Sequence, residues 1–133
     1  MRALVVVLAL AAAIAGSATA ASSSRTALTV TYWAEGPGAG TSVTWTLRCS
    51  PARGSLPRAA AACARLASGG RRVFAPVAKN AVCTQIYGGP QVALVVGVVD
   101  GRRLWARLRR RNGCEIERWG RVSPWLLPAG GTS

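Results

Sequence analysis

Two short stretches of the chain alternate between apolar and polar side chains, which is the pattern of a β-strand with one buried face. The first is LTVTYW, from Leu28 to Trp33, and the second is SVTWTLRC, from Ser42 to Cys49. Between them, EGPGAG at positions 35–40 is rich in glycine and proline and cannot sustain regular structure. We therefore predict a hairpin of two antiparallel strands, each with one face in the core.

The middle of the chain predicts one helix and a second hairpin. Arg58–Ala67 is alanine-rich, begins after a proline and ends before two glycines, as helices commonly do. Val92–Val99 is a continuous apolar run, which we interpret as a central strand. Asp100-Gly101 is a favoured two-residue hairpin turn, so Arg102–Arg109 should return as the partner strand.

The C-terminal part of the chain adds two further elements. Ile116–Trp119 predicts a last short strand, and Trp125–Leu127 predicts a segment that enters the core. Together these elements predict a single α+β domain, with one antiparallel sheet and one or two short helices on a face.

The first twenty residues predict a signal peptide that is removed. Arg2 supplies a positive charge, Ala3–Ala15 is apolar, and Ala18–Ala20 has the A-x-A form of a cleavage site. The apolar run is shorter than the about 20 residues that a membrane-spanning helix needs. We expect a secreted, extracellular domain of residues 21–133, with a core of about 28–127 and no stable membrane insertion. An uncleaved anchor is the alternative.

Four cysteines follow the predicted signal peptide: Cys49, Cys63, Cys83 and Cys114. An even number of cysteines in a small exported domain indicates two disulfides, and the sequence alone allows three pairings. The chain has no histidine and no C-x-x-C pair, so we expect no zinc site. We predict no other metal and no cofactor.

Groups that could perform catalysis are scarce. Without histidine, the Ser-His-Asp and Cys-His arrangements are excluded. Glu115 and Glu117 lie two positions apart, hence on one face of the predicted strand, where they could act as an acid–base pair. We favour the interpretation that they offset neighbouring arginines. The protein is therefore predicted not to be an enzyme.

The chain is strongly basic, with a formal net charge of +13, which favours acidic partners. Arg102–Arg111 joins arginines with Trp105, so a cationic extracellular module that binds polyanions is our second hypothesis. A solvated hairpin face, with arginine stems over apolar surface, or a subunit interface accounts for the same residues. We favour these over nucleic acid, which an exported disulfide-linked protein seldom meets.

Residues 82–90 (VCTQIYGGP) match neither a strand nor a helix. Cys83 provides a covalent anchor at one end and Pro90 stiffens the other, which leaves residues 84–87 to be presented to a partner. A protease binds its substrate as an extended strand. A peptide held in that shape beforehand loses little entropy on association. The stretch therefore predicts a loop that blocks a protease, and a plain disulfide-anchored turn is the alternative.

Several short motifs occur in a characteristic order along the chain. They are LTVTYW, TWTLRCSP, C-x-P…G-x-x-P…C from Cys49 to Cys63, ACARL followed by two glycines, VCTQIYGGP, G-x-x-x-G at 97–101 and NGCE at 112–115. Over residues 28–127 this set resembles the subtilisin inhibitor-like proteins of streptomycetes and related actinobacteria. The resemblance implies the pairings Cys49–Cys63 and Cys83–Cys114, an antiparallel sheet of about five strands covered by two short helices, and a homodimer formed through the sheet.

The resemblance also implies roles for individual residues. The reactive bond would be Gln85–Ile86, with Gln85 in the primary pocket of an extracellular subtilisin-like serine protease. The side-chain amide of Asn112 would support the loop backbone from below. The other residues expected to contact the protease are Val82, Cys83, Thr84, Tyr87 and Gly88.

Two features of this loop depart from the family pattern. The family commonly has Tyr-Asp-Pro after the reactive bond, whereas this chain has Tyr87-Gly88-Gly89-Pro90, which is one residue longer. Because glycine widens conformational freedom, this predicts a softer loop that is easier to cut. Gln85 suits neither a trypsin-like pocket nor an apolar one in particular, although a broad subtilisin-type pocket would tolerate it. A non-inhibitory relative of the family is therefore an alternative.

Overall fold

The structure is a computed structural model that describes residues 15–17 and 25–130 of the 133-residue chain. Most of the predicted signal peptide, residues 1–20, lies outside the described residues, so that assignment stays a prediction. In the part of the chain that is described, no helix has both the length and the apolar character needed to cross a membrane.

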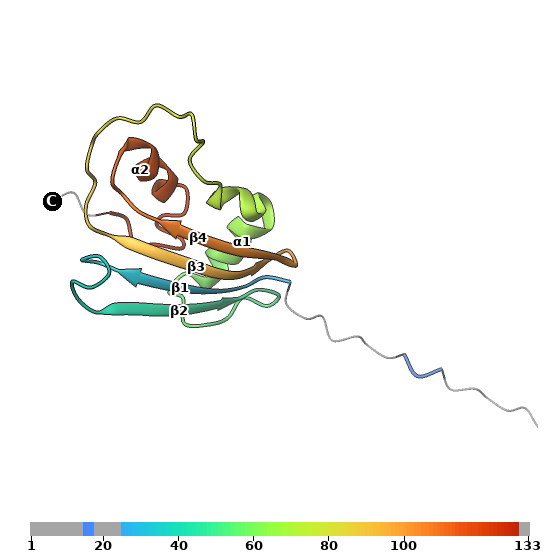
Figure 1. Cartoon of the computed structure of the whole chain (residues 1–133). Helices are drawn as coiled ribbons and strands as arrows, with labels where there is room; N and C mark the ends of the chain where they lie inside the picture. The colour runs from blue at the N-terminus through green and yellow to red at the C-terminus, as the bar shows by residue number, and fades with distance from the viewer. Residues whose placement is uncertain (1–14, 18–24, 131–133) are drawn as a thin grey trace, which may run out of the picture.

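One antiparallel sheet of four strands forms the base of the fold (Figure 1). The strands are β1 (Ala27–Trp33), β2 (Ser42–Arg48), β3 (Val92–Val99) and β4 (Arg102–Leu108), in the order β2-β1-β3-β4. In this register Val30 of β1 lies between Trp45 of β2 and Val95 of β3. Both predicted hairpins are therefore confirmed, and so is the central place of Val92–Val99.

The turn between β3 and β4 shows why its two residues were informative. Asp100 and Gly101 have φ values of 50° and 77°, so both occupy the left-handed region. A two-residue hairpin turn of this kind needs positive φ at both positions, which Asp-Gly tolerates better than most pairs. The predicted turn is confirmed.

Two α-helices and one short 3₁₀ helix cover one face of the sheet. They are α1 (Ala59–Gly69), η1 (Gly70–Phe74) and α2 (Gly113–Gly120). The first agrees closely with the helix predicted at Arg58–Ala67. It ends where Gly70 adopts a φ of 57° and its N–H donates to the carbonyl of Leu66, as expected of a glycine that stops a helix.

The predicted strand at Ile116–Trp119 is wrong, because these residues lie in α2. Asn112 precedes the helix in an extended conformation, and its side-chain oxygen accepts a hydrogen bond from the Glu115 N–H at 3.0 Å. Asparagine is a favoured N-cap, and a glutamate three residues later is part of the same helix-start signature. The sheet therefore has four strands where about five were predicted, while the α+β class and the two helices are confirmed.

The two glutamates near the C-terminus lie on this helix, and each pairs with an arginine four positions away. Glu115 pairs with Arg111 at 3.3 Å, and Glu117 pairs with Arg121 at 3.7 Å. This agrees with the prediction that they offset arginines. Exposed pairs of this kind contribute little to stability, about 0–1 kcal/mol each.

The hydrophobic core lies between the sheet and the helices. Trp119 of α2 packs there together with Leu66 of α1 and Val30 of β1. The C-terminal Trp125–Leu127 is buried as predicted. Both buried indoles have hydrogen-bond partners, since Trp119 Nε1 donates to the Pro128 carbonyl and Trp125 Nε1 to the Arg121 carbonyl, each at 3.0 Å. The core therefore includes these indoles without leaving their N–H groups unpaired.

Two disulfides tie the helical layer to other segments. Cys49 and Cys63, with Cα atoms 5.5 Å apart, join the end of β2 to α1. Cys83 and Cys114, with Cα atoms 5.3 Å apart, join the segment before β3 to the start of α2. These are the pairings that the family resemblance implied, and they are confirmed.

Candidate functional site

A long segment without regular secondary structure, residues 75–91, connects η1 to β3. We call this segment the arch, because in Figure 1 it passes around α2 on its way from η1 to the start of β3. Its course brings residues 82–90 next to the connection between β4 and α2, to which Cys83 is bonded through Cys114. The arch is therefore held in place by residues that are distant from it in the sequence.

The centre of the arch is exposed to solvent. Val82 is 99% exposed, Ile86 61% and Tyr87 66%, and Thr84 and Gln85 are exposed as well. Large apolar side chains clustered at the surface are typical of binding surfaces, since folding alone favours their burial. We call residues 84–87 the bait segment. The structure presents this segment at the surface and does not bury it in the core.

The upstream end of the bait segment is attached to the start of α2 in two ways. The first is the Cys83–Cys114 disulfide. The second is a backbone hydrogen bond, in which the Gly113 N–H donates to the Thr84 carbonyl at 2.9 Å. A Cβ atom at position 113 would overlap the hydroxyl oxygen of Thr84. Glycine at this position therefore allows the loop to approach the helix so closely.

The downstream end of the bait segment is attached one residue after Tyr87. There the Gly88 N–H donates to the Arg110 carbonyl at 2.7 Å. A Cβ atom on Gly88 would lie 2.7 Å from Cγ1 of Ile116, a distance that real Cβ atoms do not reach. The bait segment thus spans two backbone hydrogen bonds, both made to residues 110–113.

The second glycine of this downstream end is also restricted by its surroundings. Gly89 has a φ of 130°, a conformation that residues other than glycine rarely adopt. A Cβ atom at this position would also overlap the side-chain oxygen of Gln91. The two glycines therefore fill positions where larger residues do not fit. The predicted softness of the loop remains a prediction, and these contacts oppose it.

The residue assigned to the primary pocket makes a contact within its own loop. The side-chain nitrogen of Gln85 donates to the Cys83 carbonyl at 3.2 Å. A protease pocket that accepts Gln85 would have to replace this single exposed hydrogen bond. The net free energy of such a bond is modest, about 0.5–1.5 kcal/mol, so the contact does not prevent insertion.

Asn112 has a different contact from the one we expected. Its side-chain oxygen caps α2 by accepting from the Glu115 N–H, while the contacts to the loop come from its neighbours Arg110 and Gly113. Support of the loop by the Asn112 amide nitrogen stays a prediction. Asn112 contributes indirectly, since the helix that it caps begins with Gly113 and carries Cys114.

The upstream base of the arch is held by Arg118 of α2. Its guanidinium donates to the carbonyls of Phe74 and Ala75 at 2.8 and 2.9 Å, and to the Arg107 carbonyl of β4 at 2.8 Å. Burial lowers the pKa of this guanidinium, the charge of Glu115 acts in the opposite direction, and nearby Arg121 lowers the pKa further. One cation thereby joins η1, the arch and the edge strand of the sheet.

Three residues of the site were not predicted: Arg110, Gly113 and Arg118. Each acts through a contact with a residue distant in the sequence, so no local pattern identifies it. The available signal was their closeness to Cys114, because a disulfide from Cys83 must bring this whole segment under the loop.

The sequence of this chain matches a known family over most of its length. A family model described as subtilisin inhibitor-like matches residues 11–111, which include the whole sheet and the whole arch. The chain belongs to the subtilisin inhibitor-like family. The matched part of this subtilisin inhibitor-like chain ends just before Asn112, so the residues of α2 that hold the loop lie beyond it.

Among solved structures, this subtilisin inhibitor-like chain is similar to Streptomyces caespitosus sermetstatin, whose crystal structure was determined in complex with Bacillus licheniformis subtilisin. The two share 27% sequence identity, with a TM-score of 0.49. The similarity covers 77% of this chain and 97% of the matched chain. No curated protein matches the chain.

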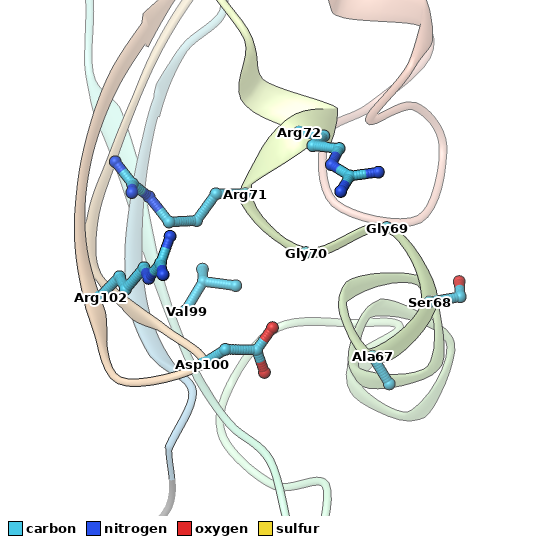
Figure 2. Close-up of a pocket in the computed structure, with 9 residues that line it drawn as sticks. All are labelled: Ala67, Ser68, Gly69, Gly70, Arg71, Arg72, Val99, Asp100 and Arg102. Atoms are coloured by element: carbon cyan, nitrogen blue, oxygen red, sulfur yellow. The ribbon is translucent and has the colours of Figure 1, made fainter.

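The subtilisin inhibitor-like domain also has a groove of about 690 Å³ at the opposite end of β3 from the bait segment. It lies between the end of α1 and the β3–β4 turn, and Arg71, Arg72 and Arg102 are among its lining residues (Figure 2). In Figure 2, Arg71 and Arg102 extend on the same side of the groove, whereas Arg72 points to another side. The carboxylate of Asp100 shares the groove. A polyanion would thus meet mixed charge here, and the cationic-module hypothesis stays a prediction.

Proposed function

We propose that this protein is a secreted inhibitor of subtilisin-type serine proteases that inserts residues 84–87 as a substrate-like strand. Membership of the subtilisin inhibitor-like family supports protease inhibition and argues against an enzyme. The observation that carries the assignment of the loop is the exposed bait segment fixed at both ends, by Gly113 to Thr84 and by Arg110 to Gly88. Gln85 enters the primary pocket, and the reactive bond is Gln85–Ile86.

The residues around the reactive bond have the accessibility that this role needs. Ile86 and Tyr87 follow the bond and offer exposed apolar side chains to the protease. Thr84 and Cys83 precede it, and Val82 extends the contact upstream. Gly88 closes it downstream. An interface of ordinary size, about 1,600 Å² in total, is enough for tight binding when its central residues are well packed.

The attachments at both ends explain how cutting the loop would fail to end inhibition. When the protease serine attacks the Gln85 carbonyl, the Ile86 amine is released. The disulfide at Cys83 holds the acyl side, and the Gly88 hydrogen bond holds the amine side. Reacting groups held together in this way behave as though each were present at very high concentration, up to about 10⁵–10⁸ M in favourable geometry. The amine therefore returns to the acyl carbon faster than water replaces it.

Titration against subtilisin tests the proposal with an Ile86→Pro variant. We expect the wild type to abolish activity stoichiometrically and the proline variant to inhibit at least about 100-fold less well. Proline lacks the N–H that a protease binds, and it restricts the backbone of Gln85. Ile86→Val, which keeps the N–H and the branched shape, serves as the matched control.

Two results would contradict this proposal. One is inhibition by Ile86→Pro that equals the wild type, which would place the contact elsewhere. The other is rapid cleavage after Gln85 with no lasting inhibition, which would identify a non-inhibitory relative. Trypsin, titrated in parallel, shows whether Gln85 favours the broad pocket of a subtilisin.

We also propose that the protein forms a homodimer through the face of the sheet that the helices leave uncovered. On this face Trp105 of β4 is 67% exposed and pairs in register with Val96 of β3, which is 38% exposed. Arg103 and Arg107 flank the tryptophan on the same face and are exposed. An apolar centre with a charged rim is the composition of a typical subunit interface.

Sedimentation of a Trp105→Glu variant tests the dimer. We expect a dimer for the wild type and a monomer for the variant, since the substitution removes the apolar centre of the interface and buries a charge there. Tyr87→Glu is the matched control, because Tyr87 is similarly exposed but lies on the bait segment, and this variant should remain dimeric. A wild type that is monomeric at high concentration, or a Trp105→Glu variant that remains dimeric, would contradict the proposal.

A further inference from the structure

We propose that Arg110 is a positioning residue that clamps the downstream end of the bait segment, an inference that rests on the proposed function. Arg110 holds both backbone polar groups of Gly88. Its carbonyl accepts from the Gly88 N–H at 2.7 Å, and its guanidinium Nη1 donates to the Gly88 carbonyl. Hydrogen bonds from a cation are shorter and about twice as strong as neutral ones. No other residue of the bait segment or its flanks is held in this way by one partner among the described residues.

The same guanidinium reaches past the two glycines. Its Nη1 also lies 3.3 Å from the side-chain oxygen of Gln91, which is the last residue of the arch. Arg110 therefore connects the two ends of Gly88–Gln91, the stretch that is one residue longer than the common family loop. The backbone of Gly88-Gly89 is intrinsically flexible. The Arg110 side chain restricts it through its contacts with Gly88 and Gln91.

The surroundings of Arg110 show that its guanidinium occupies a fixed place. Its Nε atom is fully buried and finds no hydrogen-bond partner within the described residues. Gly130 packs against the guanidinium so closely that a Cβ there would overlap it. A buried donor without a partner is unfavourable. The buried Nε atom of Arg110 therefore lowers the stability of the fold. What the guanidinium contributes in return is its contacts with Gly88 and Gln91.

The charge of Arg110 also acts on Tyr32 in β1. The pKa of Tyr32 in β1 is raised chiefly by burial and secondly by the charge of Glu35, while the charge of Arg110 opposes this rise. The charge of Arg110 is therefore close enough to β1 to act on the Tyr32 hydroxyl.

This position gives Arg110 a specific part in the reaction of the loop with a protease. The serine oxygen forms a bond to the Gln85 carbonyl carbon as the bond to the Ile86 nitrogen breaks, and the amine takes up the proton that the serine lost. The reverse step forms the peptide bond again and returns that proton. Ile86 is two residues from Gly88, so a clamp at Gly88 keeps the new amino terminus beside the acyl carbon. Without the clamp, the amine leaves and water completes the hydrolysis.

Three variants separate this role from packing and from charge. Arg110→Met keeps most of the side-chain volume but removes the donors, and Arg110→Lys returns a charged donor on a differently shaped side chain without the planar guanidinium. Arg111→Ala is the matched control, since this neighbouring arginine is exposed and pairs with Glu115. Amide hydrogen exchange is measured at Gly88 and at Gly113, whose N–H forms the upstream hydrogen bond.

We expect Arg110→Met to accelerate exchange of the Gly88 N–H by about tenfold or more, because loss of the charge-assisted hydrogen bond to the Gly88 carbonyl lets this end of the loop open more often. Exchange at Gly113 should not change. The lysine variant should restore part of the protection, and Arg111→Ala should behave as the wild type. Equal acceleration at both glycines would make Arg110 a general packing residue and would overturn the proposal. No acceleration at Gly88 would overturn it as well.

A second measurement follows the reaction itself. Each protein is incubated with a catalytic amount of subtilisin, and the equilibrium ratio of cut to intact Gln85–Ile86 bond is determined. We expect this ratio to rise about tenfold in Arg110→Met with an unchanged melting temperature, and to recover partly in Arg110→Lys. An unchanged ratio contradicts the clamp. If the wild type does not inhibit subtilisin, the proposed function fails, whereas the exchange measurement still decides whether Arg110 holds Gly88.

Discussion

Replacing Cys83 and Cys114 together with serine should turn the inhibitor into an ordinary substrate of subtilisin. We expect lasting inhibition to weaken by at least about 100-fold, because the acyl half of the cut loop would no longer stay beside the amine half. The bond links positions separated by 31 residues. In the chain-entropy model its removal increases the entropy of the unfolded chain and lowers the free energy of unfolding by about 3.7 kcal/mol. The measurement is the time course of protease inhibition together with the appearance of chain cut after Gln85.

The other disulfide provides the control. Serine at Cys49 and Cys63 should cost a comparable amount of stability, about 3 kcal/mol for its shorter loop, although this bond joins β2 to α1 and does not contact the arch. Below the unfolding temperature of both variants, the Cys49/Cys63 variant should inhibit as the wild type does. If both double variants lose inhibition equally, or if the Cys83/Cys114 variant still inhibits for long periods, the disulfide does not act by holding the loop.

The strands of this fold could be predicted because their signals are local. Alternation along Leu28–Trp33 and the apolar run Val92–Val99 each indicate a strand without reference to any other part of the chain. The Asp100-Gly101 turn likewise depends only on the φ values of two residues. Local signals of this kind determine most of the sheet.

The second helix could not be predicted in the same way because its pattern is short and ambiguous. Ile116–Trp119 reads apolar, polar, polar, apolar, and four residues are too few to separate a strand from a helix. The information that decides in favour of a helix is the cap formed by Asn112 and Glu115. An N-cap signal outweighs so short a pattern, because it satisfies N–H groups that would otherwise lack partners.

The candidate site was predictable in its exposed part and not in its support. A disulfide anchor, polar neighbours and a proline identify residues 82–90 from sequence. The meaning of Gly88, however, depends on how close Ile116 lies to it, and that distance follows only from the packing of α2 under the arch. From sequence alone, glycine at position 88 predicts conformational freedom of the backbone. In the folded protein the same glycine is needed because Ile116 packs too closely for a larger side chain.

The upstream attachment predicts a second large effect, from Gly113→Ala. Gly113 is not among the glycines with positive φ, so alanine introduces no backbone strain there, and it favours the helix that begins at this residue. Its Cβ would nevertheless overlap the Thr84 hydroxyl and displace the bait segment. In the free protein the exposed segment can move away from this Cβ, so the melting temperature should change little. Returning the segment to the shape that a protease binds restores the overlap and costs about 1–3 kcal/mol, so the inhibition constant should rise by about tenfold to 100-fold.

A second substitution in the Gly113→Ala background shows whether the overlap is the cause. In the double variant with Thr84→Ala, the hydroxyl is absent and the nearest remaining side-chain atom, Cβ of residue 84, lies 3.4 Å from the added carbon. We therefore expect the double variant to recover most of the lost inhibition, and Thr84→Ala alone to inhibit nearly as well as the wild type. A double variant no better than Gly113→Ala would show that the contact of Thr84 with residue 113 does not set the position of the bait. Because inhibition falls in the single variant while the melting temperature changes little, a general loss of folding cannot produce the expected result.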